Sequence, residues 1–380
     1  MSCILIRGAD VYAPEHLGIN DLFIVNGKIV AMGPDLVINV PKLEVFDAGG
    51  RAVMPGIIDQ HIHVTGGGGE GGPVTRCPEL KFSDLVKAGT TSVVGVCGTD
   101  TETRSIANLL AKVRALAAEG VSTWMWTSNY AMPPTTVTGT VRRDLLAIPE
   151  CIGVKIALGD HRSSFPTEQE VMHLLSDIRV GGMISGKTGF LHIHLGDMGN
   201  VAYDILDACV SRGMPIKHIR PTHCQRHSET WARSIAFAKR GGVIDLTCKM
   251  GIHGDAAHAA ADALQAGVAS DKITLSTDGY GSMPRFDEKG EMVGLAVCPV
   301  TAIWDEFQSL VGLCGMEQAI RFVSTNLARN LGLPGKGVIA EGADADLLIL
   351  DDRMEKTEVM ARGRFLMRSG EIIVRGTFEE

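Results

Sequence analysis

The chain has 380 residues, a length that suits one large α/β domain with a smaller appendage better than three full domains. Hydrophobic residues make up 45% and charged residues 21%, which is typical of a folded globular protein and excludes a disordered one. The formal net charge of -8 argues against nucleic acid or an anionic membrane as the main partner, and we expect neither.

Cysteine usage and the N-terminal sequence indicate the compartment. The nine cysteines are scattered and form no C-x-x-C pair, which favours buried, reduced thiols over a disulfide framework. The first residues lack a basic segment followed by a long apolar stretch, so we expect no signal peptide. The sequence contains no run of about 18 uncharged apolar residues, so we expect no membrane span. The predicted location is therefore the cytoplasm.

Both ends of the chain have the pattern of short β-strands. Asn26-Gly27 separates two of these strand-like runs and predicts a tight hairpin turn. The runs cover residues 4–6, 21–25, 28–31, 345–350, 359–361, 364–367 and 372–374. Neither end is long enough to bury a core alone. Residues 1–54 and 335–380 are therefore predicted to form one small β-sandwich domain together.

The middle of the chain alternates between strand-like and helix-like segments. Apolar strand-like runs cover residues 53–64, 90–97, 122–128, 152–159, 190–196, 219–224, 243–248 and 272–277. Helical patterns follow at 105–119, 168–178, 201–211, 229–239, 255–266 and 301–310. This alternation predicts an α/β fold, a (β/α)8 TIM-like barrel over residues 55–334. A doubly wound sheet is the alternative, and the positions of the polar residues favour the barrel.

Polar residues that could bind a metal ion fall at the ends of these strand-like runs. His61 and His63 end the first run two residues apart, so both imidazoles point to the same side of the strand. His194, His223 and Asp278 end three later runs. Because the C-terminal ends of barrel strands share one mouth, we expect these side chains to converge there. Imidazole and carboxylate are common zinc ligands, so the convergence predicts a metal site.

Lys155 lies inside another of the apolar runs. An ammonium group cannot bind a metal ion, and a cation beside metal ions is disfavoured. A neutral amine could instead react with carbon dioxide to form a carbamate, whose two oxygens could bridge two ions. Two ions sharing one water molecule would lower its pKa and make hydroxide available near neutral pH. The other interpretation of Lys155 is a buried structural ion pair.

Segments along the whole chain match a known pattern. Residues 54–63 and 342–347 resemble the opening and closing signatures of the amidohydrolase superfamily. Further segments narrow the resemblance to the isoaspartyl dipeptidase family; they are 66–73, 98–100, 160–163, 221–223 and 276–279. The resemblance extends from Ile4 to Thr377. It implies a metal-dependent barrel that cleaves the isopeptide bond of β-aspartyl dipeptides.

The resemblance also implies the cofactor and its ligands. Two divalent metal ions are implied, and zinc is the expected metal. The implied ligands are His61, His63 and Asp278 for the first ion, His194 and His223 for the second, and carboxylated (carbamylated) Lys155 as the bridge. Asp278 would act as the general base and acid as well as a ligand.

Residues around the implied metal site would bind the dipeptide. Glu70 would pair with the free α-amino group, and Arg162 and Arg226 would pair with the two carboxylates. The other implied contacts are Tyr130, which would polarise the scissile carbonyl from a mobile loop, and Thr99 and Ser282, which would line the pocket. A β-aspartyl dipeptide carries one amine and two carboxylates, so one acid and two arginines complement its charges.

Two other functions remain open at this point. The first is an N-acyl-amino-acid deacylase or cyclic-amide hydrolase on the same scaffold, against which Glu70, Tyr130 and the two arginines favour the peptidase. The second is a catalytically silent barrel kept as an assembly subunit, which the complete ligand set disfavours. Residues 248–255 depart from the family pattern and leave the preference for the leaving residue open. The resemblance suggests a homo-oligomer, an octamer or a lower even oligomer.

Overall fold

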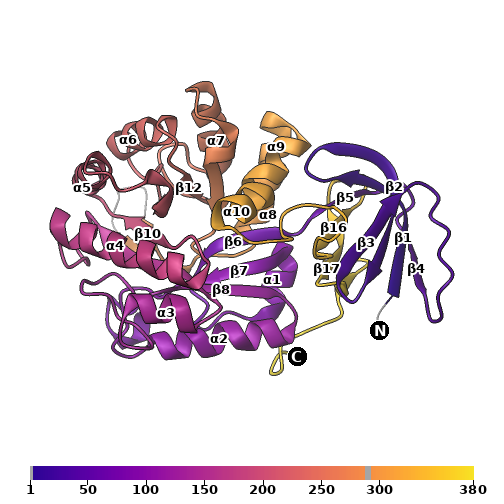
Figure 1. The fold of residues 1–380 in the computed structure, drawn as a ribbon, viewed down its shortest axis with the longest axis horizontal. Coiled ribbons are helices and arrows are strands. Elements are labelled where there is room, and N and C mark those ends of the chain that lie inside the picture. Colours follow the sequence, from indigo (N-terminus) through magenta and orange to yellow (C-terminus); the bar gives the residue numbers. More distant parts are fainter. Residues whose placement is uncertain (1–2, 287–291) are drawn as a thin grey trace.

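The two ends of the chain pair with each other in the computed structural model, which describes residues 3–286 and 292–380. Within this part of the chain they form a nine-stranded sheet in the order β19-β18-β17-β16-β5-β1-β2-β3, with β4 paired to β1. Figure 1 shows the indigo N-terminal strands beside the yellow C-terminal ones. The strands are β1 (Cys3–Tyr12), β2 (His16–Val25), β3 (Lys28–Gly33), β4 (Glu44–Asp47), β5 (Ala52–Pro55), β16 (Leu347–Leu350), β17 (Lys356–Ala361), β18 (Arg364–Arg368) and β19 (Glu371–Ile372).

The predicted hairpin turn and the shared core explain this pairing. Asn26 and Gly27 both adopt positive φ, 49° and 80°, as a two-residue turn between β2 and β3 requires. β5 joins the two halves, because it pairs in parallel with β1 and antiparallel with β16. Apolar residues of both halves, such as Ile24 and Ile349, lie in one buried cluster. Neither half buries this cluster alone, which agrees with the expectation from the sequence.

The middle of the chain forms the barrel, and the doubly wound alternative is wrong. β6 to β11 make one six-stranded parallel sheet, and β12 pairs in parallel with β13. Two backbone hydrogen bonds close the barrel. The N–H of Cys224, just after β11, donates to Asp245 O in β12 (3.3 Å), and the N–H of His63, just after β6, donates to Gly279 O beyond β13 (2.8 Å). The barrel strands are β6 (Ile57–Ile62), β7 (Thr90–Gly95), β8 (Ser122–Thr127), β9 (Cys151–Leu158), β10 (Phe190–Leu195), β11 (Ile219–Thr222), β12 (Ile244–Thr247) and β13 (Ile273–Ser276).

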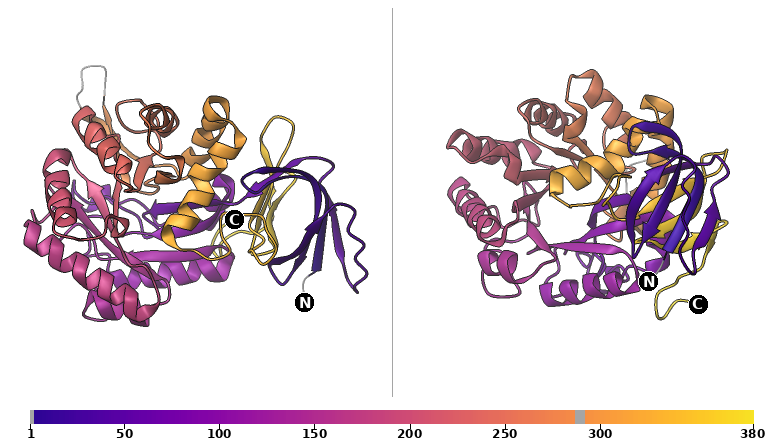
Figure 2. Two further views of the ribbon diagram at one scale, coloured as in Figure 1. Left: turned by 45° about the horizontal axis from the view of Figure 1, so that its top comes forward. Right: turned by 45° about the vertical axis from the view of Figure 1, so that its right-hand side comes forward.

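Helices surround the barrel, and the sheet of the chain ends stands beside it (Figure 2). Predicted helices appear as α2 (Ile106–Glu119), α4 (Glu168–Ser185), α5 (Gly199–Ser211), α6 (Ser228–Lys239), α7 (Ala256–Gln265) and α8 (Ala302–Cys314). Their ends follow local signals, since Ser105 accepts a hydrogen bond from the Asn108 N–H at the start of α2. Thr167 and Glu170 form a capping box at the start of α4. No helix among the described residues is both long and apolar enough to cross a membrane.

Shorter elements without a strong sequence pattern complete the fold. The short helices are α1 (Phe82–Ala88), α3 (Val141–Ala147), α9 (Met316–Ile320), the π-helical turn Arg321–Thr325 and α10 (Asn326–Leu331), with 3-10 turns at Pro73–Thr75, Ile216–His218 and Ser270–Lys272. β14 (Ser282–Phe286) pairs antiparallel with β15 (Met292–Val297). β14 begins four residues after Asp278 and so brings Ser282 to the mouth of the barrel.

Candidate active site

The predicted ligands lie near or just beyond the C-terminal ends of the barrel strands. His61 lies in β6, His194 lies in β10, and His63 follows the end of β6 by one residue. His223 and Asp278 come just after β11 and β13 and adopt left-handed backbone conformations, with φ of 63° and 53°. Non-glycine residues rarely adopt positive φ, and such strain is often found at functional sites. Both turns direct polar side chains into the C-terminal mouth.

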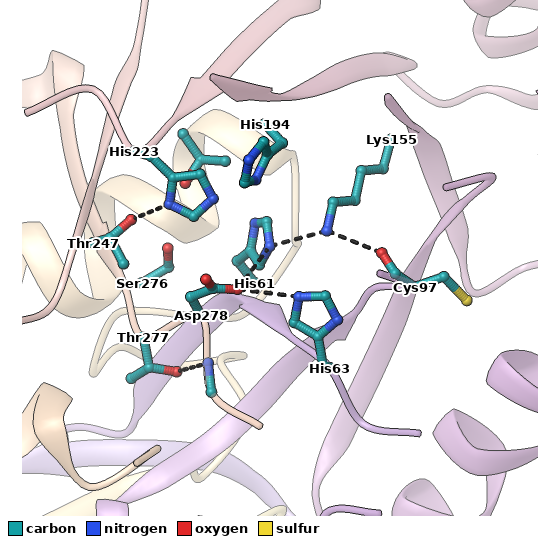
Figure 3. Close-up of polar contacts among 12 residues, drawn as sticks. His61, His63, Cys97, Lys155, His194, His223, Thr247, Ser276, Thr277 and Asp278 are labelled. Atoms are coloured by element: carbon teal, nitrogen blue, oxygen red, sulfur yellow. Dashed lines mark hydrogen bonds and ion pairs between the residues drawn. The ribbon is translucent and has the colours of Figure 1, made fainter. Parts of the chain in front are cut away.

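Figure 3 shows the predicted ligands pointing toward one another. Asp278 Oδ1 lies 3.3 Å from His61 Nε2 and 3.1 Å from His63 Nε2. One candidate ligand atom each from His61, His223 and Asp278 lies within 4.8 Å of the others. The ring of His194 packs edge-on against that of His223, with centroids 4.5 Å apart. The structure therefore brings the five predicted imidazole and carboxylate ligands into one cluster.

The hydrogen bonding of His223 fits a metal ion. Its Nδ1 lies 2.7 Å from Thr247 Oγ1, while its buried Nε2 has no hydrogen-bond partner among the described residues. A buried polar atom without a partner is costly, and a cation bound at Nε2 would satisfy it. Nitrogen and carboxylate donors around one point suit zinc and other divalent transition metals. The cluster is thus a fitting metal site.

Charge states in the cluster also suit a cation. Burial, followed by the nearby Lys155, lowers the pKa of His61 to about 3, and burial lowers the pKa of His194 to about 3. Burial opposes ionisation of Asp278, but hydrogen bonds from His61 and His63 outweigh it and hold its pKa well below the usual range. The site therefore offers neutral imidazoles and an ionised carboxylate, the forms that bind metal ions.

Lys155 sits beside this cluster, where its amine contacts a histidine nitrogen and a backbone carbonyl. Its Nζ lies 3.1 Å from His61 Nε2 and 3.0 Å from Cys97 O. Among the described residues, no carboxylate lies within ion-pair distance of Nζ, which argues against a structural ion pair. Burial lowers the pKa of Lys155 to about 8. A useful fraction of the amine is therefore neutral near pH 7, as carbamate formation requires.

A cavity of about 480 Å³ opens above the cluster. Its walls include Glu70, Tyr130, Arg162, Arg226 and Ser282 together with His63, His194 and Asp278. Thr99 is not part of the described wall; its hydroxyl instead donates to Glu70 Oε1 at 3.1 Å. Arg162 Nη1 also donates to Glu70 Oε1, at 3.2 Å. The cavity therefore combines one carboxylate with two guanidinium groups above the cluster.

Two of these wall residues have further contacts. Arg226 Nη1 lies 3.3 Å from Asp197 Oδ1 at the rim. The Tyr130 hydroxyl lies 2.9 Å from His194 Nδ1, and the Tyr130 ring is 5.1 Å from both Lys155 Nζ and the Arg162 guanidinium. Burial raises the pKa of Tyr130, so its hydroxyl stays protonated and can donate a hydrogen bond.

Comparison with known proteins decides the family. The sequence matches the Amidohydrolase family over residues 52–374, which is most of the chain. The chain belongs to the amidohydrolase family. It is also similar to the beta-aspartyl dipeptidase of Fervidobacterium islandicum AW-1, whose crystal structure is in complex with a beta-Asp-Leu dipeptide. That structure is 41% identical, with a TM-score of 0.90, over 97% of this chain and 98% of that one.

Two more distant similarities are to other proteins. A D-hydantoinase (dihydropyrimidinase) from Thermus sp. covers 99% of this chain and 98% of its own, with a TM-score of 0.72 and 15% identity, which shows a common fold alone. The imidazolonepropionase of Ruegeria sp. (strain TM1040) is 25% identical over 331 residues, 80% of this chain and 79% of that protein. The predicted resemblance to the superfamily and the predicted barrel are therefore confirmed.

The glycine-rich segment of this amidohydrolase carries Glu70 on a tightly folded loop. Arg104 is buried and donates to the carbonyls of Gly66 and Gly67 at 2.7 and 2.6 Å. A Cβ on Gly66 would lie 2.3 Å from Cys77 O, and one on Gly68 would lie 2.4 Å from Thr75 O. Only glycine fits at these close approaches, because backbone atoms cannot yield. The segment is thus a shaped wall of the cavity.

Two residues behind the ligands were not predicted from the sequence as parts of the site. His192, two residues before His194 in β10, lies with Nε2 2.7 Å from His61 Nδ1 and stacks on Trp126 at 4.9 Å between ring centroids. It therefore supports His61 from behind. Asp160, noted only as part of a motif, contacts both His194 and Arg162. Its position two residues beyond β9, the strand that carries Lys155, was the signal available in the sequence.

Proposed function

We propose that this amidohydrolase is a metal-dependent dipeptidase that hydrolyses the isopeptide bond of β-aspartyl dipeptides. The observation that carries the proposal is the placement of Glu70, Arg162 and Arg226 in one cavity above the histidine and aspartate cluster. These charges complement a ligand with one ammonium and two carboxylate groups. Similarity to the Fervidobacterium beta-aspartyl dipeptidase over nearly the whole chain supports the same substrate class.

The proposed cofactor is a pair of divalent cations, with zinc as the expected metal. Its proposed ligands are His61, His63 and Asp278 for one ion, His194 and His223 for the other, and carboxylated Lys155 between them. Such ions, when bound, polarise a carbonyl group and lower the pKa of a water molecule. The neutral imidazoles, the ionised Asp278 and the partly neutral amine of Lys155 support this assignment.

The chain's own residues would bind and orient the dipeptide. Glu70 would receive the α-ammonium group, and Thr99 would orient Glu70 through its hydroxyl. Arg162 and Arg226 would bind the carboxylates, and Ser282 would line the facing wall. Without substrate, Glu70 pairs with Arg162 and Arg226 pairs with Asp197. When the substrate binds, its charged groups would replace these ion-pair partners. Glu70, Arg162 and Arg226 would therefore be paired both before and after binding.

Proton movement in the reaction is assigned to Asp278. Its carboxylate would take a proton from the attacking water and pass it to the nitrogen of the leaving amino acid as the C–N bond breaks. The Tyr130 hydroxyl would donate a hydrogen bond to the scissile carbonyl oxygen as negative charge develops there. The products are then aspartate and a free amino acid.

A hydrolysis screen of the zinc-loaded enzyme tests the proposal. It would compare β-Asp-Leu with α-Asp-Leu, N-acetyl-D-amino acids and dihydrouracil. We expect turnover of β-Asp-Leu, with kcat/KM at least about a hundredfold above that of the other compounds, since each 1.4 kcal/mol corresponds to about tenfold. Preferred turnover of the N-acetyl compounds or of dihydrouracil would replace the dipeptidase with a deacylase or a cyclic-amide hydrolase.

We also propose that the chain works in the cytoplasm as an even-numbered homo-oligomer, with residues 55–334 as the barrel domain and the two ends, 1–54 and 335–380, as the second domain. Light scattering of the purified protein would measure the number of subunits. A monomer in solution would contradict this part of the proposal.

A further inference from the structure

Asp160 forms a junction between two functional side chains. It lies just beyond β9 and is 1% exposed. Its Oδ1 accepts hydrogen bonds from the backbone N–H and from Nε of Arg162, both at 2.8 Å. Its Oδ2 accepts from Arg162 Nη2 at 2.8 Å and from His194 Nε2 at 3.0 Å. One buried carboxylate therefore contacts a proposed metal ligand and a proposed substrate-binding arginine.

We propose that Asp160 is a positioning residue that couples the orientation of His194 toward the metal site to the orientation of Arg162 toward the substrate. The proposal rests on the dipeptidase function proposed above, in which His194 binds a metal ion and Arg162 binds a carboxylate. In this proposal Asp160 itself binds neither the substrate nor the metal ion.

On the histidine side, Asp160 selects the nitrogen that faces the cluster. A carboxylate only accepts hydrogen bonds, so the 3.0 Å contact assigns the ring proton to His194 Nε2. Arg162 Nη2 lies 3.3 Å from the same nitrogen and then donates to Asp160, at 2.8 Å, rather than to the ring. The unprotonated Nδ1 then points to the other side, where it lies 2.9 Å from the Tyr130 hydroxyl in the cavity wall. A carboxylate behind a histidine ligand fixes both its tautomer and its ring orientation. His194 is thus held with its lone pair toward the metal site.

On the arginine side, Asp160 holds two of the three guanidinium nitrogens. The pairs Nε–Oδ1 and Nη2–Oδ2 form a planar fork, which fixes the plane of the group. Nη1 remains directed into the cavity, where it lies 3.2 Å from Glu70 Oε1. A substrate carboxylate would therefore meet Arg162 at Nη1. The fork leaves the arginine little freedom to turn away from the cavity.

Two glycines near Asp160 allow its close approach to His194. A Cβ on Gly196, just beyond the end of β10, would lie 2.4 Å from both Cα and Cβ of Asp160. A Cβ on Gly159, whose φ is 62°, would lie 2.3 Å from Met198 O. Side chains at either position would separate the ends of β9 and β10. The two glycines let Asp160 reach His194 across neighbouring strands.

Zinc affinity in a double-mutant cycle tests the coupling. Wild type, Asp160→Asn, Arg162→Gln and the double variant would be dialysed against graded zinc concentrations, and bound zinc would be measured by elemental analysis. Loss of a carboxylate behind a histidine ligand should weaken binding of the ion assigned to His194 about 10- to 100-fold in Asp160→Asn. Arg162→Gln should weaken zinc binding less, because it removes the hydrogen bonds that hold Asp160 in place but leaves the carboxylate itself. The double variant should bind zinc no more weakly than Asp160→Asn alone, because both changes act through one carboxylate.

Steady-state kinetics at saturating zinc give a second readout. Asp160→Asn and Arg162→Gln should both raise KM for β-Asp-Leu, because each leaves the substrate carboxylate without an oriented guanidinium. Asp177→Asn is the matched control, since Asp177 forms a half-exposed ion pair with Arg142 at 2.7 Å on the surface. It should alter neither zinc affinity nor KM.

Unchanged zinc affinity in Asp160→Asn, or additive effects in the cycle, would overturn the coupling. An unchanged KM in Asp160→Asn would overturn it as well. If the wild type does not cleave β-aspartyl dipeptides, the proposed function fails, whereas the zinc cycle still decides whether Asp160 couples the two residues. Circular dichroism would check the fold, and Asp160→Ser, which also lacks the carboxylate, would replace an unfolded Asp160→Asn in the same cycle, with the same outcomes.

Discussion

The Tyr130 hydroxyl and His194 Nδ1 lie 2.9 Å apart, and the rings of the two residues are in contact, with centroids 4.6 Å apart. Because Asp160 accepts a hydrogen bond from His194 Nε2, Nδ1 is the nitrogen left to face the metal site. Tyr130 therefore stands directly beside a proposed metal-binding atom. A substrate carbonyl oxygen bound beside His194 Nδ1, at the proposed metal site, would lie within hydrogen-bond reach of the Tyr130 hydroxyl.

Removal of this hydroxyl should slow the chemical step. We expect Tyr130→Phe to lower kcat by about 10²- to 10³-fold, as for the loss of a hydrogen-bond donor to a developing oxyanion. KM and melting temperature should change little, because the ring remains in place. Tyr203→Phe is a suitable control, since that buried tyrosine bonds Ser234 on the helical side of the barrel. An effect of Tyr130→Phe on KM alone would assign Tyr130 to binding.

Lys155→Ala should remove the proposed bridging carbamate. We expect the variant to lose much of the second metal ion and nearly all activity, and small carboxylic acids to restore part of the rate by occupying the gap. Elemental analysis together with a rescue series of acids would measure both effects. Two ions per chain and normal turnover in Lys155→Ala would contradict the carbamate proposal.

Carbamate formation should depend on pH through the Lys155 amine. Burial lowers its pKa to about 8, so the neutral form increases as pH rises through 8. At pH 7 about one-tenth of such an amine is neutral, against less than about one-thousandth for an ordinary lysine. Metal-free enzyme mixed with zinc and a fixed concentration of carbon dioxide should therefore regain activity faster at pH 8 than at pH 7. A rate that falls or stays constant over this interval would argue against a reactive amine.

Asp278→Asn should affect turnover far more than substrate affinity. The substitution removes the proposed cation-binding charge and the proposed proton acceptor, so kcat should fall by several orders of magnitude. The ratio of the effects on kcat and KM would come from initial rates at saturating zinc. A variant changed mainly in KM would show that Asp278 is only a part of the pocket wall.

Glu70 should distinguish dipeptides from N-acyl amino acids. N-succinyl-leucine keeps the length and the carboxylate of β-Asp-Leu but lacks the amine. A charge-assisted hydrogen bond to the amine contributes roughly 1.5–3 kcal/mol, and an unpaired Glu70 adds a further cost. We expect kcat/KM for the succinyl compound to be lower by about a hundredfold or more. In Glu70→Gln the difference should shrink, mostly because kcat/KM for β-Asp-Leu falls. Equal hydrolysis of both compounds by the wild type would favour a deacylase.

Much of the architecture was readable from local patterns in the sequence. The eight runs of the middle segment became β6 to β13, whose residues are almost all buried, and burial on both faces favours the apolar residues that mark each run. Asn26-Gly27 formed its turn because these residues accept positive φ. Short helices such as α3 (Val141–Ala147) escaped prediction because two helical turns show too little periodicity.

The sequence by itself determined which polar residues stand at strand ends, and the closed barrel then brought them together. Only the tertiary structure decided which partner each residue contacts. Asp160 and His194 are 34 positions apart, and His61 and His192 are 131 apart, yet each pair is in hydrogen-bond contact. Such contacts depend on the register between neighbouring strands and on close approaches such as that of Gly196 to Asp160. Strand periodicity tells which face a side chain points to, but only packing sets its distance from a side chain on another strand.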